Sequence, residues 1–594
     1  MRARSYLRNG SAFIAALSMA FAVASAEDFD RIAPKTPKPS PPVQLSAPAV
    51  EPKAATASAK PVLAELRGLR FVSRAADVVK TGAHDEGIAV ASDDLAPLVD
   101  SDISQRLARD FLGKPLSLAD LDAIAQAVKA WYRAHSLPLV DVTFPEQDIS
   151  TGTVQAVVTI YRLGQVHVRD NGRFSQGQIL QEMQLKPGDP LDFDRLRADL
   201  NRLGRNPFHP VDVVLAKGTA PGQTDLDLDL HARFPLRVYL SYDNDGEAVT
   251  GRERYSAGIN LGNLFGLDEQ LSYQFMTSPD LWRDRHRGPG LSNDPRFTAH
   301  SLTFISPLPW GDYVNVFAAY SQMVPDLGPY FGQRGHDLEI GAHYIHDLLP
   351  IGALSHQLTL GFDFKRTDNN LAYGGVAVSA HSVNVEQFSL TYNASRPDDW
   401  GQTALENTLV VSPGGLSDGN TTSAFLAYGT VGAHAGYAYD RLDLSRVNVL
   451  THGFSAYAHF EGQIASTELL PSEQIGAGGI DSVRGYDPRK VNGSNGAVGS
   501  IELRSPSISL LSMVLPRARD QLQLLAFYDA GWVAYRNDQP YQPRNASLQS
   551  AGVGARYTIS RFIDARFDDG WQLQKAPGAT SLGNLATVSV TLSY

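Results

Sequence analysis

One arginine, Arg484, stands where a charge is not expected. The segment from Gly476 to Tyr486 reads GAGGIDSVRGY and lies between two stretches that alternate like membrane strands. A glycine-flanked loop tip usually lies in solvent and needs no arginine. Further along the chain, the strand-like Phe527-Tyr-Asp529-Ala-Gly531 holds one acid among apolar residues. If both charges face a water-filled lumen, we expect them to pair and to hold the loop inside a barrel.

The rest of the chain offers little that could do catalytic chemistry. Gly415-Leu-Ser417-Asp-Gly419 matches the G-x-S-x-G pattern, which needs a strand, a sharp turn and a helix. It falls in a loop rich in Pro, Gly, Ser and Asn, from Ser412 to Thr422, with no helix expected after it. The 15 histidines are scattered without metal-ligand spacing, and Walker and dinucleotide patterns are missing. We therefore predict no catalytic residue, no metal site and no cofactor.

Composition narrows the class of protein. Cysteine is absent, which excludes a disulfide scaffold, a zinc ribbon and a thiol nucleophile. The 594 residues are too many for one ordinary core, so several domains are expected. After the first 26 residues no apolar run reaches the roughly 20 residues of a spanning helix. The aromatic content (25 Phe, 23 Tyr, 6 Trp) with slightly negative mean hydropathy fits either a water-soluble protein or a membrane β-barrel.

The first 61 residues predict a secretory signal and then a tether. Residues 1–26 contain Arg2, Arg4 and Arg8, an apolar stretch, and Ala24-Ser25-Ala26, the layout of a cleavable signal peptide. A short membrane anchor is the alternative, but the apolar stretch is brief for one. Removal takes away three arginines and no acid, so the net charge moves from −11 to −14. An acidic exported chain argues against nucleic-acid binding. Residues 27–61 hold eight prolines and predict an extended, semi-rigid tether.

Residues 62–162 and 163–232 predict two small α/β units. In the first, Ser117 is a candidate N-cap with Asp120 at the third helical position. Helical spacing of apolar residues follows, at Leu118, Leu121, Ala125, Val128 and Trp131 or Tyr132. Each unit is expected to run strand, two helices, two strands. The expected elements are strands Leu139–Phe144 and Thr153–Tyr161, then a strand near Val166, helices near Ile179–Met183 and Phe193–Leu203, and strands Val211–Leu215 and Asp225–Leu230.

Residues 234–594 predict a transmembrane β-barrel. Leu236, Val238, Leu240 and Tyr242 alternate with polar residues, and later segments repeat the pattern. Short turns alternate with longer polar loops, one of which (278–296) includes His286 among arginines. That loop is predicted to be solvated, with a lipopolysaccharide contact as the alternative. The length accommodates about sixteen antiparallel strands at typical spacing. The chain ends on Tyr594, which we expect at the closing edge of the barrel.

Taken together, these motifs resemble the outer-membrane transporters of two-partner secretion, the hemolysin and filamentous-hemagglutinin secretion proteins of the Omp85 superfamily. Val483-Arg484-Gly485-Tyr486 is similar to the signature of the family's sixth extracellular loop, here about residues 466–496, which folds into the lumen. Phe527, Asp529 and Gly531 are similar to the F-x-D-x-G strand motif whose acid contacts that arginine. Asn206-Pro207-Phe208, followed by a strand, resembles the helix-to-strand junction of the second POTRA domain.

The resemblance implies a bacterial outer-membrane pore of about sixteen strands, with two POTRA domains in the periplasm. It would secrete an unfolded partner, a large exoprotein with an N-terminal β-helical secretion domain. Outer-membrane lipid or lipopolysaccharide and, during biogenesis, the barrel-assembly machinery are further expected partners. Candidate partner-binding residues of the second POTRA domain are Phe193, Leu196, Leu200, Leu203, Val211, Val213 and Leu215.

Three other functions stay open at the level of the sequence: an insertase of outer-membrane proteins, a passive porin and a barrel enzyme. An insertase usually carries more POTRA units than these residues can hold. Some relatives also carry an N-terminal helix that plugs the barrel. Here about seven residues, from Glu27 to Ala33, precede the prolines, too few for a stable isolated helix. The sequence leaves open whether a plug is present.

Overall fold

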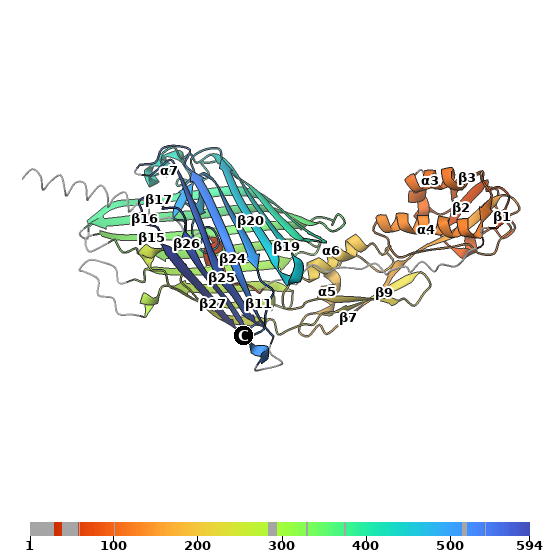
Figure 1. Ribbon diagram of the computed structural model, residues 1–594, viewed down its shortest axis with the longest axis horizontal. Coiled ribbons are helices and arrows are strands. Elements are labelled where there is room, and N and C mark those ends of the chain that lie inside the picture. The colour runs from red at the N-terminus through yellow and green to blue at the C-terminus, as the bar shows by residue number, and fades with distance from the viewer. Residues whose placement is uncertain are drawn as a thin grey trace, which may run out of the picture. The chain divides into compact units, whose positions relative to one another are not determined.

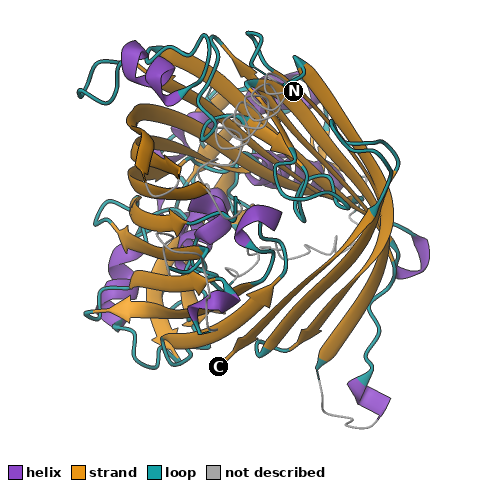
Figure 2. Ribbon diagram, turned by 90° about the vertical axis from the view of Figure 1, so that its left-hand side faces the viewer, coloured by secondary structure: helices purple, strands orange, loops and turns teal. Residues whose placement is uncertain are grey.

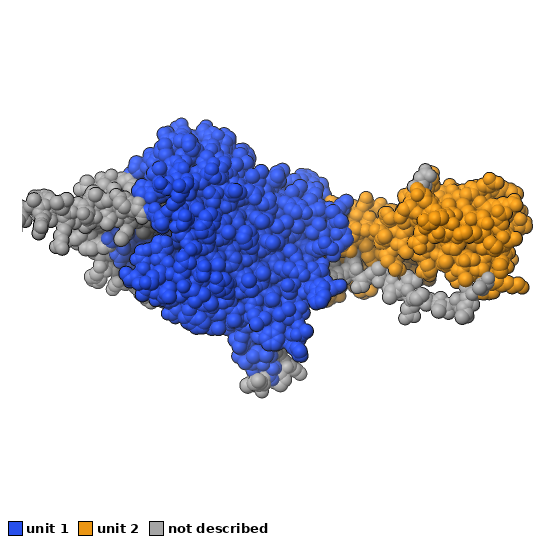
Figure 3. Space-filling model, turned by 45° about the horizontal axis from the view of Figure 1, so that its top comes forward, with its two compact units in different colours: residues 1–38, 235–594 blue, residues 39–234 orange. Residues whose placement is uncertain are grey.

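The structure is a computed structural model that describes residues 29–37, 58, 60–99, 101–282, 294–327, 331–373, 376–513, 519–540 and 542–594. The predicted signal peptide and His286 with its neighbouring arginines lie outside the described residues. The chain divides into two compact units: residues 1–38 with 235–594, and residues 39–234 (Figure 3). Within the described ranges, no helix has the length and apolar character needed to cross a membrane.

The second unit begins with an α/β module around a four-stranded sheet of order β3-β2-β6-β5. The capping box predicted at Ser117 is present, because Ser117 and Asp120 exchange side-chain and backbone hydrogen bonds. Leu118 is exposed and Leu121 is only partly buried, so the fully buried face of this helix starts at Ile124. The parallel edge strand β3 was not predicted. The elements are β1 (Pro61–Leu63), β2 (Gly68–Val72), β3 (Gly87–Val90), α3 (Asp102–Phe111), β4 (Leu116–Ser117), α4 (Leu118–Ala134), β5 (Val140–Thr143) and β6 (Thr153–Ile160), with 3-10 turns η1 (Ala75–Asp77) and η2 (Asp93–Leu98).

A second module repeats the same path with a three-stranded sheet of order β7-β9-β8. Both modules contain a strand followed by two helices and two strands, to which the first module adds β1, β3 and β4. The last strand pairs in parallel with the shared first one, β6 with β2 and β9 with β7. The core lies between the sheet and the helices. The elements are β7 (Arg162–Arg169), α5 (Gln176–Glu182), α6 (Phe193–Leu203), β8 (Asp212–Lys217) and β9 (Gln223–Asp229).

The other unit is a closed barrel of sixteen antiparallel strands, as predicted (Figures 1 and 2). Side chains alternate across the wall: in β24, Leu525, Phe527 and Asp529 are buried inside, whereas Leu524 and Tyr528 are exposed outside. The strands are β10 (Leu236–Asp243), β11 (Arg254–Leu264), β12 (Glu269–Thr277), β13 (Phe297–Pro307), β14 (Tyr313–Met323), β15 (Phe331–Asp347), β16 (Ser355–Tyr373), β17 (Val376–Asp398), β18 (Gly401–Ser412), β19 (Tyr437–Val449), β20 (Ser455–Ala465), β23 (Asn495–Arg504), β24 (Asp520–Ala534), β25 (Asn545–Ile559), β26 (Ile563–Gln572) and β27 (Asn584–Ser593).

The two rims of the barrel differ in their connections. At the rim where the chain enters β10, six connections are short: 265–268, 308–312, 348–354, 399–400, 450–454 and 560–562. A seventh connection at this rim, 505–519, is much longer. The opposite rim carries longer loops, with η3 (Ala248–Thr250), η4 (Pro279–Leu281), helix α7 (Thr422–Tyr428) and the segment between β20 and β23. The remaining 3-10 turns are η5 (Thr451–Gly453) and η6 (Leu511–Met513).

The barrel closes between its first and last strands. β10 pairs with β27, and Tyr594 extends the pairing by exchanging both backbone hydrogen bonds with Val238. The Tyr594 side chain is exposed at the entry rim. This is the edge at which the sequence places it, and closure leaves neither terminal strand with a free edge.

Residues 29–37 lie inside the ring of strands, where α2 (Phe29–Ile32, red in Figure 1) makes a single helical turn. Phe29 packs against Phe317, with ring centroids 4.3 Å apart. Gln274 on β12 donates to the carbonyl of the buried Ile32, and Lys35 donates to the Ser241 hydroxyl on β10. These residues therefore belong with the barrel, whereas the sequence assigned them to the tether. The short helix is held by the wall.

Candidate functional site: the loop folded into the barrel

The site is built on residues 466–494, called the L6 loop below, which connect β20 to β23. Two short strands, β21 (Ile475–Ala477) and β22 (Val491–Gly493), pair into a hairpin inside the barrel. Apolar residues of this hairpin share a buried cluster with wall residues of β23, β24 and β25, among them Val498, Val533 and Leu548. The loop is thus packed against the inside of the wall.

Arg484 lies at the centre of the contact between loop and wall. Its Nε and Nη2 donate to the two carboxylate oxygens of Asp529 at 2.8 and 2.7 Å, and its backbone N–H donates to the same carboxylate at 3.0 Å. Nη2 also donates to the Ser500 hydroxyl, and Nη1 donates to Glu502 at 2.6 Å. Arg484 is only 3% exposed and Asp529 is fully buried. The planar guanidinium is satisfied by a bidentate, charge-assisted pair in a site with little water.

The other motif residues shape the surfaces that meet there. The Phe527 ring lies beneath the guanidinium, 3.5 Å from its carbon, which adds a cation–π contact. Gly531 faces the loop so closely that a Cβ would come within 2.9 Å of both Ala477 and Val483 side chains. Gly485 has φ +91°, and a Cβ on it would lie 2.6 Å from a wall carbonyl. The glycines let two backbones approach, which explains the F-x-D-x-G and V-R-G-Y spacing.

Val483 and Tyr486 complete this contact. Both side chains are buried in the cluster shared by loop and wall. The Tyr486 hydroxyl lies within hydrogen-bond distance of the carbonyl oxygens of Gln549 and Gln574, between which it shares its proton. The four residues of the loop motif, Val483, Arg484, Gly485 and Tyr486, therefore meet Asp529 at one place, which is called the latch below.

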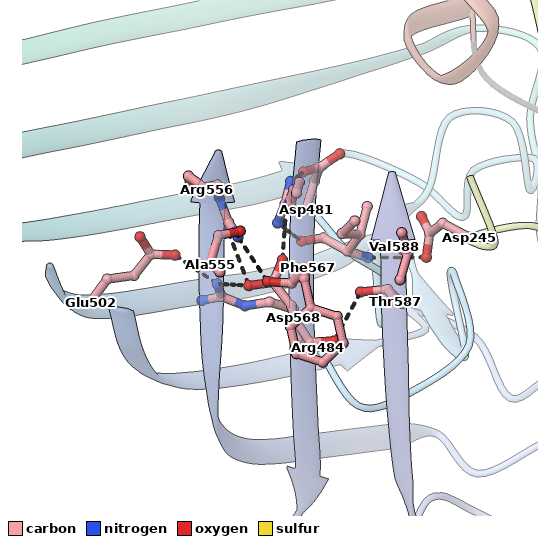
Figure 4. Close-up of polar contacts among 12 residues, drawn as sticks. Asp245, Asp481, Arg484, Glu502, Ala555, Arg556, Phe567, Asp568, Thr587 and Val588 are labelled. Atoms are coloured by element: carbon pink, nitrogen blue, oxygen red, sulfur yellow. Dashed lines mark hydrogen bonds and ion pairs between the residues drawn. The ribbon is translucent and has the colours of Figure 1, made fainter. Parts of the chain in front are cut away.

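A wider network of charges surrounds Arg484, and Figure 4 shows the part of it around Asp568. Asp568 on β26 lies 3.5 Å from Arg484 and accepts from Arg556 and Arg566 at 3.0 and 2.7 Å. Arg566 also pairs with Asp481 of the loop. With Arg504, which pairs with Glu502, the network holds four arginines and four acids, so its charges balance. Asp481 is largely exposed, whereas Arg484, Asp529, Glu502 and Asp568 are buried, and the partly buried Arg504, Arg556 and Arg566 offset the excess of acid among them.

A second anchor holds the opposite arm of the L6 loop. Glu473, almost fully buried, accepts from Gln387 on β17 and Tyr439 on β19, and pairs with Lys365 on β16 at 3.1 Å. Nearby, the buried Glu468 carboxylate accepts from the backbone N–H groups of Arg536 and Asn537, in the loop after β24. The L6 loop is therefore tied to both sides of the barrel wall.

Sequence reasoning did not find these additional acids. Glu502 and Asp568 carry a recognisable signal, since each occupies an inward-facing position of an alternating strand, as Asp529 does. A charge on that face of a barrel strand needs a partner across the lumen. Glu473 carries no such signal because it lies in a loop.

The candidate partner-binding side chains of the second module are mostly internal. Phe193, Leu196, Leu200, Leu203 and Val211 are buried in its core, and Val213 and Leu215 pack against it. The helical and alternating spacing of these residues reflects their packing in the core. The same apolar pattern would also occur if these side chains were exposed for binding, so spacing alone does not distinguish the two. The exposed residues of β8 are Asp212, Val214 and Lys217.

Ser417 belongs to a surface loop, as expected. Its hydroxyl accepts from the Asn384 amide. The expectation that no helix follows was wrong, since α7 begins at Thr422. No group of three or more His, Cys, Asp or Glu residues suited to a metal ion is found in the described part of the chain.

This architecture defines a class: a transporter in which two POTRA modules precede a sixteen-stranded outer-membrane barrel that contains an inward-folded arginine loop. The chain belongs to the haemolysin secretion/activation protein family ShlB/FhaC/HecB, whose family model matches residues 222–557. A POTRA domain of ShlB type matches residues 92–159, and a POTRA (surface antigen variable number repeat) model matches residues 161–233. The barrel therefore lies in the bacterial outer membrane, the POTRA modules lie in the periplasm, and the protein is a two-partner secretion pore that works with a secreted exoprotein.

Similar proteins agree with this assignment. The heme/hemopexin transporter protein HuxB of Haemophilus influenzae (strain 86-028NP) is 21% identical over 76% of this chain and 77% of its own length. The outer membrane transporter CdiB of Dickeya dadantii (strain 3937) is 23% identical over 79% of each chain. Among solved structures, CdiB from Escherichia coli has a TM-score of 0.75 at 17% identity, covering 92% of this chain and 93% of its own. CdiB from Acinetobacter baumannii has a TM-score of 0.66 at 18% identity, covering 95% of each.

Proposed function

We propose that the L6 loop and residues 29–37 close the secretion pore at rest and must leave their wall contacts for the partner to pass. The observation that carries this proposal is that both segments occupy the inside of the barrel and are bonded to different parts of its wall. Arg484 and Asp529 act as the latch of the loop. The protein is an export pore without catalytic residues, and the partner moves through it unfolded.

The partner is recognised in the periplasm by the edge strand β8. Within the described part of its module, β8 has a strand neighbour on one side only, so an extended peptide can add to the sheet through backbone hydrogen bonds. Because Val214 projects from this strand and is 59% exposed, it offers an apolar contact beside the edge. Backbone pairing tolerates many sequences and orders the peptide at an entropic cost, so binding stays weak enough for release.

The partner is a large exoprotein with an N-terminal β-helical secretion domain, encoded beside this protein. Lipopolysaccharide around the barrel and the barrel-assembly machinery during biogenesis are further proposed partners. An insertase, a passive porin and a barrel enzyme are the alternatives, and membership of the secretion family favours none of them.

A pair of matched substitutions tests the docking edge. Val214→Lys places a charge on the edge strand, which opposes strand addition. Val99→Lys changes the same residue type at an exposed site outside any strand of the first module. We expect Val214→Lys, and not Val99→Lys, to lower the amount of the exoprotein encoded beside this protein in the medium. The amount of heat-modifiable barrel in the membrane should be the same for both variants. Equal secretion by both variants would refute the role of β8.

Deletion of the gene for this protein distinguishes a secretion pore from an insertase. Loss of exoprotein export with normal levels of other outer-membrane barrels is expected of a secretion pore. A general loss of outer-membrane barrels would instead identify an insertase.

A further inference from the structure

The connection between β23 and β24 differs from its neighbours at the periplasmic rim. It spans residues 505–519, whereas the other described connections at this rim have two to seven residues. Its sequence, SPSISLLSMVLPRAR, contains a run of apolar residues from Ile508 to Leu515 interrupted only by two serines. In its described part Ile508 is 50% exposed and Leu510 is 45% exposed. An apolar loop of this kind needs a partner that removes it from water.

The loop extends outward from the barrel wall. In Figure 2 its short helix η6 stands off the outer side of the wall at the lower right, and Figure 3 shows the same part as a protrusion from the barrel unit. A loop that served a soluble partner or the pore would be expected to extend along the barrel axis or over the opening. A loop directed away from the wall runs parallel to the membrane plane.

Several backbone groups of the described part are bonded within the protein. The buried Asp520 carboxylate accepts from the N–H groups of Leu510 and Leu511 at 2.8 and 3.0 Å and from the Ser509 hydroxyl. Ile508 and Leu522 exchange both backbone hydrogen bonds. Satisfied backbone groups are the condition for entering an apolar medium, since each unpaired group would cost several kcal/mol there. The loop thus presents apolar side chains on a framework that lipid can accept.

The level of the loop matches the membrane interface. The neighbouring connections at this rim expose the aromatic residues Trp310, Trp400, Phe454 and Phe562, as an interfacial girdle does. Arg519 and Arg561 are at the same rim, where cationic side chains meet lipid phosphates. The apolar loop is continuous with this lipid-facing belt.

We propose that residues 505–513 and Asp520 form an interfacial anchor that inserts Ile508 and Leu510 into the periplasmic phospholipid leaflet beside the barrel. The anchor joins the two strands that supply Ser500, Glu502 and Asp529 to the latch. It therefore fixes the depth in the membrane of the wall segment to which the L6 loop is bonded. This inference does not depend on the proposed role of the loop in gating.

Site-directed spin labelling tests the anchor in the full-length protein. Because the chain has no cysteine, Leu510→Cys gives a single labelling site. The labelled protein is reconstituted into vesicles of phosphatidylethanolamine and phosphatidylglycerol, and collision rates with oxygen and with a water-soluble nickel complex are measured. Two references are matched in exposure: Leu524→Cys, which is 50% exposed on the lipid side of β24, and Val214→Cys in the second POTRA module.

The expected result is a ratio of oxygen to nickel collisions at Leu510→Cys close to that at Leu524→Cys and several-fold above that at Val214→Cys. Nickel collisions equal to those at Val214→Cys would overturn the proposal. Low collision rates with both reagents and an immobilised spectrum would also overturn it, because they indicate a second copy of the chain or another protein as the occupant. Heat-modifiable migration verifies the folded barrel, and Ile508→Cys replaces Leu510→Cys if that variant does not assemble. The nickel complex is present on both sides of the vesicle membrane, so either insertion orientation gives the same readout.

Discussion

Replacing Asp529 by asparagine isolates the contribution of one charge to the position of the L6 loop. Asparagine keeps the shape of the side chain but removes its charge. Its NH2 group also replaces a carboxylate oxygen that accepted hydrogen bonds, so that donor faces donor at that position. Asp529 receives four hydrogen bonds, three from Arg484 and one from Ser500. Breaking a buried ion pair from one side costs roughly 3–5 kcal/mol. Arg484 keeps Glu502 at 2.6 Å and Asp568 at 3.5 Å, so we expect the lower end, about 3 kcal/mol.

A loss of this size changes the opening equilibrium of the loop by about 10²-fold, since 1.4 kcal/mol corresponds to tenfold. Val483→Cys provides the assay, because this side chain is fully buried between loop and wall and a maleimide can reach it only when the loop leaves the wall. Asp529→Asn should raise the labelling rate by about 10² in membranes that contain heat-modifiable barrel.

Asp538→Asn is the matched control for this experiment. Asp538 pairs with Arg544 at 3.9 Å, and both side chains are largely exposed. An exposed pair contributes about 0–1 kcal/mol, so the labelling rate should change by less than about fivefold. An unchanged rate for Asp529→Asn in a folded barrel would refute the idea that this charge holds the loop.

Three further predictions follow from the same structure. Gly531→Ala should displace the loop and raise labelling at Val483→Cys, whereas Gly499→Ala should not, because a Cβ there meets only a carbonyl oxygen at 3.5 Å; equal rates would contradict this account of the glycine. Lys365→Met should leave Glu473 without its cation and increase labelling at the buried Leu470→Cys, with the exposed Lys575→Met as control. If Leu470→Cys stays protected from labelling in both variants, the pair of Lys365 and Glu473 does not hold the loop. The pKa of His231 is raised above its ordinary value of 6.5 by its hydrogen bond to Asp212 and by the nearby Asp229. Its stabilising pair is therefore complete below the ordinary pKa and is lost as the pH rises through the folded pKa, and Asp212→Asn should lower the pKa measured by an NMR titration of the His231 ring.

The barrel could be predicted from sequence because its signal is local. In β10 the exposed Leu236, Val238 and Leu240 alternate with Arg237, Tyr239 and Ser241, so the spacing identifies the lipid and lumen faces. The Ser117 capping box was equally readable, since its residues lie three positions apart. The pairing of first and last strands followed from the need to remove edges.

Other parts depend on contacts that sequence spacing does not contain. Leu196 and Leu200 were predicted to bind the partner but are buried in the core of their module, because an amphipathic helix shows which face is apolar without showing whether that face is covered. The position of residues 29–37 depends on Gln274, Ser301 and Phe317, all of them far away in the chain. Glu473 finds Lys365 across the barrel, and no local pattern joins the two residues.

The L6 loop and residues 29–37 are bonded to three different sectors of the barrel wall, and this constrains how the pore can open. Arg484 is bonded to β23, β24 and β26, Glu473 to β16, β17 and β19, and residues 29–37 to β10, β12 and β13. If each charged anchor of the L6 loop costs roughly 3 kcal/mol to break, their simultaneous release by thermal motion is rarer than either release alone by about 10²-fold. Under the proposed gating, we therefore expect a partner that enters the barrel to displace the anchors one after another and to offset each loss with contacts of its own, so that the pore is open only while it is occupied.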